Sequence, residues 1–215
     1  MIICMFSNDL NDVVCITNRK ICDIDFLERI KLVAARKPYA IILREKDMAP
    51  DEYEKLAVKV KEICDRGNVT LILHTYYKTA IRLGIKKIHM PLQELEKMPP
   101  EDIGFFEGLG ASCHSVEDAK RATALGCTYV IAGHIFATDC KKDLPPRGIE
   151  FLKEVVKSVD IPVYAIGGIR LQDESKRTVP ADSSNMALAL GAGAKKVCIM
   201  SGLMSQKEPS PLTQH

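Results

Sequence analysis

The sequence lacks both a strong net charge and a long apolar run. Its 30 Lys and Arg residues stand against 28 Asp and Glu residues, so the formal net charge is +2. Because no basic field surrounds such a chain, nothing in its charge favours binding to nucleic acid or to an anionic membrane. No uncharged apolar run approaches the roughly 20 residues that a bilayer span needs. We therefore expect a small-molecule partner, no nucleic acid and no membrane.

The chain also lacks the cysteine patterns of zinc sites and the leader of exported proteins. Its eight cysteines form no CxxC pair, and none of their spacings is typical of a zinc site. Cys15 and Cys198 lie inside apolar runs, as reduced core thiols of cytosolic proteins do. The opening MIICMFSNDL has no basic segment followed by a long apolar one, so we expect no signal peptide and a cytoplasmic location.

Short apolar runs alternate with amphipathic stretches along the chain. Runs with the length and β-branched content of strands cover 13–17, 39–43, 70–74, 86–90, 108–113, 129–136, 162–168 and 195–200. Helical patterns between them cover 25–37, 50–67, 76–84, 115–126, 148–159 and 183–193. Strand–helix alternation favours parallel pairing, and nearly continuous Val, Ile and Leu favours strands buried on both faces.

This order of strands and helices predicts an α/β protein with a single (β/α)8 TIM barrel. A doubly wound open sheet is the alternative, but no GxGxxG follows the first strand. We expect one domain over 1–205 and a polar tail over 206–215, which leaves little room for an eighth helix. The polar stretch 171–184 has no assigned role, and a homo-oligomer is compatible with the sequence.

In such a barrel the chemistry lies at the C-terminal ends of the strands. Arg44 and Lys46 follow the second strand on one side of the extended chain, with Glu45 turned away. Arg offers bidentate geometry to a carboxylate or phosphate, and Lys offers a point charge. The pair is therefore a candidate anion site, although two solvated cations after the end of a strand would give the same pattern.

Glycines and a serine stand at the ends of the seventh and eighth strands. Gly167-Gly168 and Met200-Ser201 stand where barrels commonly bind phosphate through backbone N–H groups. Paired glycines let a backbone approach an oxyanion closely, and Ser201 is the expected side-chain donor. The alternative is that these glycines only form a tight turn.

A histidine follows the fifth strand. His114 comes just before Ser115, which is placed to cap the next helix. A free imidazole, with an ordinary pKa of about 6.5, can take and return a proton at neutral pH. A histidine at a strand end is also commonly structural, and the same caution applies to His74, His89 and His134.

Taken together, these residues resemble the thiamine phosphate synthase superfamily, and within it the thiazole tautomerases of the TenI type. The resemblance covers nearly the whole chain and is carried by LREK (43–46), GASCHS (110–115), GHIFATDCKK (133–142), AIGG (165–168) and MSGLM (200–204). The third of these, followed by RG, resembles the tautomerase branch more than the synthase branch.

The resemblance also bears on cofactors. In the synthases, carboxylates after strands three and four hold a magnesium ion that bridges the pyrimidine diphosphate. The corresponding positions here carry His74-Thr75 and Glu94. Magnesium needs hard oxygen ligands in strict geometry, so we expect no functional metal site and no cofactor.

The expected function is therefore a thiazole tautomerase of thiamine biosynthesis, an isomerase that aromatises a carboxythiazole phosphate by a proton shift at His114. The remaining expected ligand-binding residues are Arg44, Lys46, His74, Ser112, Thr138, Lys141, Gly167, Gly168, Met200 and Ser201. Two alternatives stay open. One is a thiamine phosphate synthase that joins hydroxymethylpyrimidine diphosphate to thiazole phosphate, and the other is a non-catalytic regulator that binds thiazole phosphate.

Overall fold

The computed structural model describes residues 10–138, 144–171 and 184–205. The expected polar tail at 206–215 and nearly all of the stretch 171–184 lie outside these residues. Each expected strand is present, and the strands are β1 (Val13–Ile16), β2 (Ala40–Leu43), β3 (Thr70–His74), β4 (Lys87–Pro91), β5 (Gly108–Cys113), β6 (Tyr129–Gly133), β7 (Val163–Ile166) and β8 (Lys196–Ile199).

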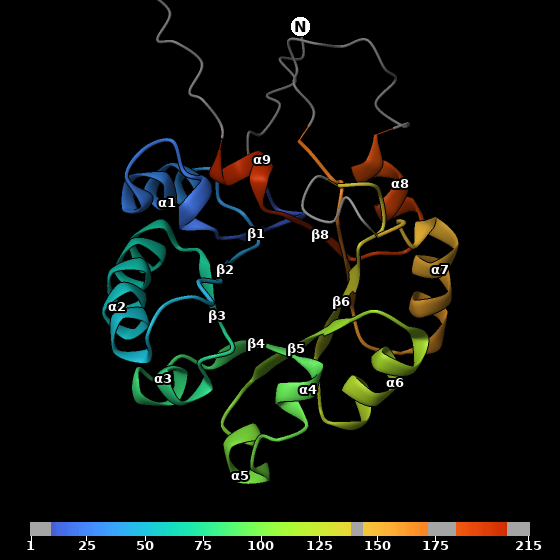
Figure 1. The fold of residues 1–215 in the computed structure, drawn as a ribbon, viewed down its shortest axis with the longest axis horizontal. Helices are drawn as coiled ribbons and strands as arrows, with labels where there is room; N and C mark the ends of the chain where they lie inside the picture. The colour runs from blue at the N-terminus through green and yellow to red at the C-terminus, as the bar shows by residue number, and fades with distance from the viewer. Residues whose placement is uncertain (1–9, 139–143, 172–183, 206–215) are drawn as a thin grey trace, which may run out of the picture.

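The strands close into a barrel in chain order, with every neighbouring pair parallel and β8 paired to β1. Helices surround this barrel on all sides in the view of Figure 1. The predicted (β/α)8 barrel is therefore confirmed, and the open-sheet alternative is excluded because β1 and β8 are hydrogen-bonded neighbours.

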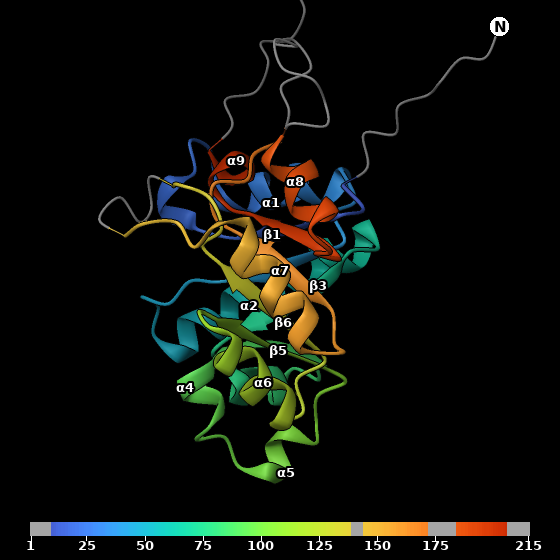
Figure 2. The ribbon, with the colours of Figure 1, turned by 90° about the vertical axis from the view of Figure 1, so that its right-hand side faces the viewer.

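The helices are η1 (Arg19–Ile21), α1 (Phe26–Ala35), α2 (Pro50–Gly67), α3 (Tyr77–Arg82), α4 (Leu92–Leu95), α5 (Pro100–Ile103), α6 (Val116–Ala124), α7 (Gly148–Ser158), α8 (Asn185–Gly191) and α9 (Ser201–Met204). All six predicted helices are among them. The single-turn helices α4 and α5 were not predicted, because Pro99 and Pro100 interrupt the helical pattern between β4 and β5. Helices α6 and α7 face the viewer in Figure 2 and pack over β5, β6 and β7.

Strands β6 and β7 end earlier than the sequence predicts. Gly167 and Gly168 have φ angles of 104° and 67°, which are outside the range of extended strands. Because β7 stops at Ile166, which pairs with Gly133, β6 has no partner strand beyond that glycine. The chain then leaves the barrel as a loop, which brings residues 134–138 to the open end of the barrel.

Apolar side chains fill two separate regions. The larger lies between the barrel and its helices, and the smaller occupies the barrel interior. Within the interior the rings of Tyr129 and Tyr164 stack with centroids 4.9 Å apart. A Cβ atom at Gly110 would lie only 2.0 Å from the Tyr129 ring, so glycine is needed there to make room for it. These rings fill the barrel next to His89, whose ring lies 5.7 Å from that of Tyr129.

The six cysteines of the described segments are free thiols, five of them buried, which agrees with the expected core role. A search of the same segments finds no helix that could cross a bilayer.

Candidate functional site

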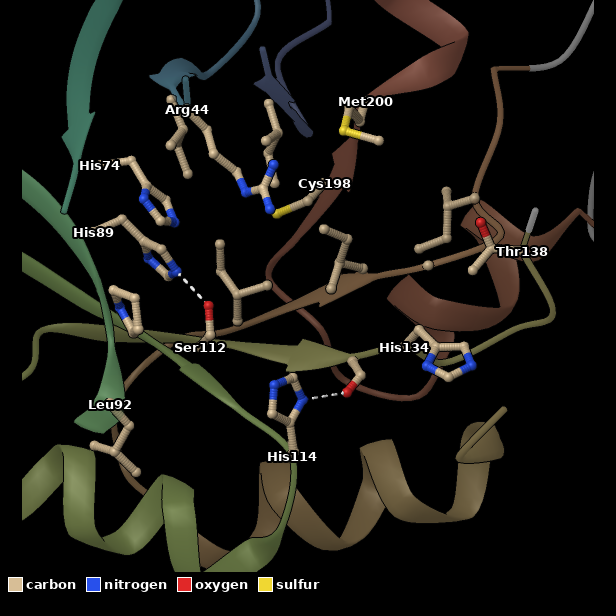
Figure 3. A pocket seen from close by; sticks show the side chains of 18 of the residues that line it. Arg44, His74, His89, Leu92, Ser112, His114, His134, Thr138, Cys198 and Met200 are labelled. Carbon is tan, nitrogen blue, oxygen red and sulfur yellow. Dashed lines mark hydrogen bonds between the residues drawn. The ribbon is translucent and has the colours of Figure 1, made fainter. Parts of the chain in front are cut away.

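A pocket of about 550 Å³ lies at the C-terminal ends of the barrel strands. This volume is within the range of small-molecule sites. Except for Lys141, which lies outside the described residues, every residue expected at the site lines the pocket: Arg44, Lys46, His74, Ser112, His114, Thr138, Gly167, Gly168, Met200 and Ser201. Figure 3 shows side chains from opposite sides of the barrel converging on this space. The roles assigned to them remain predictions.

The loop after β2 supplies the pocket with two cations. The Arg44 side chain reaches into the pocket from the end of β2, as Figure 3 shows, and Lys46 lines the same space. Partial burial and the neighbouring charge of Arg44 lower the pKa of Lys46. No carboxylate of the described segments forms a salt bridge with either side chain. This end of the pocket therefore carries positive charge without a counter-ion.

The carboxylate between these cations faces away from the pocket, as strand alternation predicts. Glu45 is 3% exposed and accepts hydrogen bonds from Thr17 Oγ1 at 2.7 Å and from the Arg19 backbone N–H at 3.1 Å. Thr17 Oγ1 in turn accepts the Arg44 backbone N–H at 2.9 Å. The Arg19 guanidinium lies 3.1 Å from Glu45 and also binds Asp47. Buried hydrogen bonds thus fix the backbone on which Arg44 and Lys46 stand.

Two buried histidines lie beside the cations. His74 Nδ1 contacts Thr75 Oγ1 at 2.7 Å, and His89 contacts Ser112 Oγ at 2.9 Å through Nε2 and the Tyr129 hydroxyl at 3.3 Å through Nδ1. Burial lowers the pKa of His74 to about 2, assisted by the neighbouring His89, Lys46 and Arg44. Burial, with the charges of Lys46 and Arg44, lowers the pKa of His89 to about 3. Both imidazoles are therefore neutral at pH 7.

His114 is held at the rim of the pocket with a fixed ring orientation. Its Nδ1 lies 2.8 Å from the Gly133 carbonyl oxygen (Figure 3), and a carbonyl only accepts, so Nδ1 carries the proton. Its backbone N–H donates to Asp118 Oδ2 at 2.7 Å. Ser115 caps α6 by accepting the Asp118 N–H, as predicted. In the neutral ring, Nε2 is then left as an acceptor for a ligand.

The glycines after β7 pack against the loop after β6. A Cβ atom at Gly167 would lie 2.3 Å from the His134 Cβ, and one at Gly168 would lie 2.4 Å from the Ala137 carbonyl oxygen. Both residues also have positive φ. Glycine is therefore required for the fold of this end of the pocket, and the close approach observed is to protein backbone.

Sequence reasoning missed several other lining residues. Asp118 on α6 and Leu92-Gln93 on α4 reach the pocket, together with a wall of isoleucines at 16, 42, 131 and 166. Strand alternation could have identified the isoleucines, because each is at or near the last inward-facing position of its strand. The polar residues stand on helices, and α4 was not predicted.

The described residues do not fit the magnesium site that the synthase resemblance implies. Thr75 stands at one carboxylate position, and Glu94, at the other, pairs with Lys97 at 3.1 Å and does not line the pocket. Asp118 lines the pocket, but its Oδ2 accepts the His114 N–H. No cluster of three metal-binding side chains exists within the described ranges, and magnesium favours oxygen ligands over imidazole. Asp139 lies outside those ranges.

The family model for thiamine monophosphate synthase matches residues 13–203. The chain belongs to this family. A thiamine-phosphate synthase of Fusobacterium nucleatum is 30% identical over 208 residues, which cover 93% of each chain. One from Clostridium tetani is 36% identical over 135 residues, 62% of this chain and 65% of the relative. A thiamine phosphate pyrophosphorylase structure from Pyrococcus furiosus has a TM-score of 0.74 at 24% identity, covering 94% of this chain and 90% of that one, and it shows the same fold.

These comparisons correct the expected activity. The prediction of a thiazole tautomerase is wrong, because the curated relatives are named thiamine-phosphate synthases. The error came from interpreting the missing carboxylates as loss of the synthase reaction. Their absence bears on how a diphosphate is held, whereas the bond that forms depends on which two substrates the pocket brings together.

Proposed function

We propose that the protein is a transferase of thiamine biosynthesis that joins a hydroxymethylpyrimidine diphosphate to a thiazole phosphate. The names of relatives that align over most of the chain support this proposal. The observation that carries it is the pair Arg44 and Lys46, which forms no salt bridge with a carboxylate of the described segments and so suits the more highly charged substrate. The volume of about 550 Å³ is adequate for two small ligands.

The reaction requires little chemistry from the protein. The thiazole nitrogen forms a bond to the methylene carbon of the pyrimidine, and the bond from that carbon to the diphosphate oxygen breaks. The electron pair of the broken bond leaves with the pyrophosphate, and no proton needs to move in this step. The protein must therefore hold the two substrates in line, stabilise the leaving diphosphate and exclude water.

The pocket residues divide between these tasks. We assign Arg44 and Lys46 to the diphosphate, and Met200, Ser201 and Thr138, with the Gly167-Gly168 backbone, to the thiazole phosphate at the ends of β6, β7 and β8. The free Nε2 of His114 suits an amino group on the pyrimidine ring, since an amino group donates. The isoleucine wall suits the apolar faces of both rings.

The test is a condensation assay with both substrates, followed by ³¹P NMR for pyrophosphate and thiamine phosphate. The parent chain should form both products in equal amounts. Arg44→Gln should lower the rate about 10²-fold, because it removes a charged donor from the leaving group, whereas Arg66→Gln, an equal charge change on exposed α2, should stay within twofold.

Absence of product in this assay would contradict the transferase proposal. Tight binding of thiazole phosphate without turnover would favour the non-catalytic regulator instead. The observation in favour of that second candidate is that no cluster of three metal-binding side chains exists among the described residues.

A further inference from the structure

We infer that this chain holds the diphosphate of its pyrimidine substrate by direct contacts with Arg44, Lys46 and His74, with no divalent ion between the phosphates and the protein. The inference rests on the proposed function for the identity of the ligand. It departs from the magnesium-bridged arrangement that the family resemblance implies. The arguments for it come from the side chains that line the pocket.

The first argument is the set of donor and acceptor atoms at the cation end of the pocket, which is the part lined by Arg44 and Lys46. Near Arg44 the described part of the pocket offers nitrogen donors, namely guanidinium, ammonium and imidazole groups. A magnesium ion would be repelled by the two cations and would find none of its preferred carboxylates there. A diphosphate, in contrast, is an acceptor at every terminal oxygen. Arg44 can bind two of these oxygens with its planar fork, and Lys46 can bind another.

The second argument is the position of Glu45. This carboxylate lies between Arg44 and Lys46 in the sequence and is the nearest group along the chain that could neutralise them. It is instead buried on the other side of the strand end, where Thr17 and Arg19 occupy both of its oxygens. The positive charge in the pocket is therefore left for a ligand, and an anion there would relieve the mutual repulsion of Arg44 and Lys46.

The third argument is the state of His74. The His74 residue is only 4% exposed, and its side chain lines the pocket beside Arg44 (Figure 3). Its Nδ1 contacts Thr75 Oγ1, and this is the one hydrogen bond that the ring makes within the described segments. If the Thr75 hydroxyl donates to Nδ1, then Nε2–H is a neutral donor directed at the ligand. Burial and the nearby cations lower the pKa of His74 and keep the ring uncharged. The ring can therefore donate a hydrogen bond to a phosphate oxygen without adding a positive charge to the pocket.

The test measures binding of inorganic pyrophosphate to the full chain by isothermal titration calorimetry. One titration contains EDTA, and the other contains excess magnesium. We expect binding in EDTA, and equal or weaker affinity with magnesium, because magnesium competes for free pyrophosphate in solution. Binding that appears only with magnesium, or that tightens tenfold or more, would overturn the inference, and so would absence of binding in both titrations.

Variants locate the binding site. Arg44→Gln should weaken pyrophosphate binding in EDTA about ten- to hundredfold, the usual effect of losing a charge-assisted pair. Lys46→Gln should weaken it about three- to tenfold, because it removes one point charge from the phosphate oxygens. Arg66→Gln on α2 is the control and should leave affinity within twofold. Equal losses in all three variants would indicate nonspecific attraction and would contradict the assignment.

The binding assay and the condensation assay can fail independently. Condensation that strictly requires magnesium would support the proposed transferase and overturn the metal-free inference. Pyrophosphate binding in EDTA without any condensation would support direct contacts at Arg44 and Lys46 and contradict the proposed function.

Discussion

The two ends of the pocket are built by different means. At the end of β2, charged side chains point into the pocket from a backbone held by the buried Glu45. At the end of β7, Gly167 and Gly168 pack directly against the loop after β6. The first end depends on side-chain hydrogen bonds and charges, and the second depends on backbone conformation and close packing. Substitutions of Arg44 or Lys46 should therefore change ligand binding, whereas substitutions of Gly167 or Gly168 should disturb the local fold.

The largest effect should come from protonation of the buried histidines at the cation end. The pKa values of His74 and His89 are about 2 and 3 in the folded chain, against an ordinary value of 6.5. Below pH 6.5 the unfolded chain therefore binds protons that the folded chain does not, and the free energy of unfolding falls as pH decreases toward 3. Proton binding to these two histidines in the unfolded chain should lower the free energy of unfolding by about 4 kcal/mol between pH 7 and pH 5.

Urea denaturation at several pH values measures this loss. His74→Gln should remove roughly half of this pH dependence, because His89 is then the one of these two buried rings that remains. A free energy of unfolding that stays flat between pH 7 and pH 5 would contradict the neutral, buried state of these rings.

The glycine end can be tested with two alanine substitutions that differ only in packing. Gly84 and Gly168 have nearly equal φ angles of 66° and 67°, but a Cβ atom at Gly84 has no atom within 4 Å, whereas one at Gly168 meets Ala137 at 2.4 Å. Gly84→Ala should cost about 1–2 kcal/mol for the left-handed backbone. Gly168→Ala should cost about 2 kcal/mol more, because it overpacks the contact. Equal losses in urea denaturation would mean that the close approach has no energetic role.

A smaller effect is expected from the carboxylate that fixes the cation end. Glu45→Gln weakens the hydrogen bonds to Thr17 and Arg19 in a buried position, so it should lower the free energy of unfolding by about 2 kcal/mol. Asp47→Asn is the matched control, since its side chain is 41% exposed and pairs with the same arginine. It should cost less than Glu45→Gln, because solvent screens an exposed ion pair. If Asp47→Asn lowered the free energy of unfolding more than Glu45→Gln, then Asp47, and not Glu45, would be the carboxylate that holds this backbone.

Most of the fold could be predicted because the strands are short apolar runs separated by amphipathic stretches. The prediction was wrong where local pattern and tertiary packing disagree. The run 129–136 continues as apolar residues, yet β6 ends at Gly133 because its partner β7 turns at Gly167. The single-turn helices α4 and α5 were missed because each is only four residues long and follows a proline. The spacing of apolar residues along a sequence does not predict where a partner strand ends, and it does not predict a single helical turn that follows a proline.

The candidate site was largely accessible from the sequence because a barrel collects strand ends at one face. That rule identified Arg44, His114 and Ser201 without coordinates. It could not show that Glu45 binds Arg19, that both nitrogens of His89 are occupied, or that Gly168 contacts Ala137. Each of these contacts joins segments that are far apart in the sequence. The reaction itself was predicted wrongly, because the identities of binding residues do not determine which bond is made.

The central claim is that the two ends of the pocket each hold one phosphorylated group. The most direct test is a crystal structure of the chain grown in EDTA with inorganic pyrophosphate and thiazole phosphate. The account predicts pyrophosphate in contact with Arg44 and Lys46, and the thiazole phosphate group beside Gly168 and Ser201. Both anions at one end, or an empty cation end that fills only when magnesium is added, would contradict it.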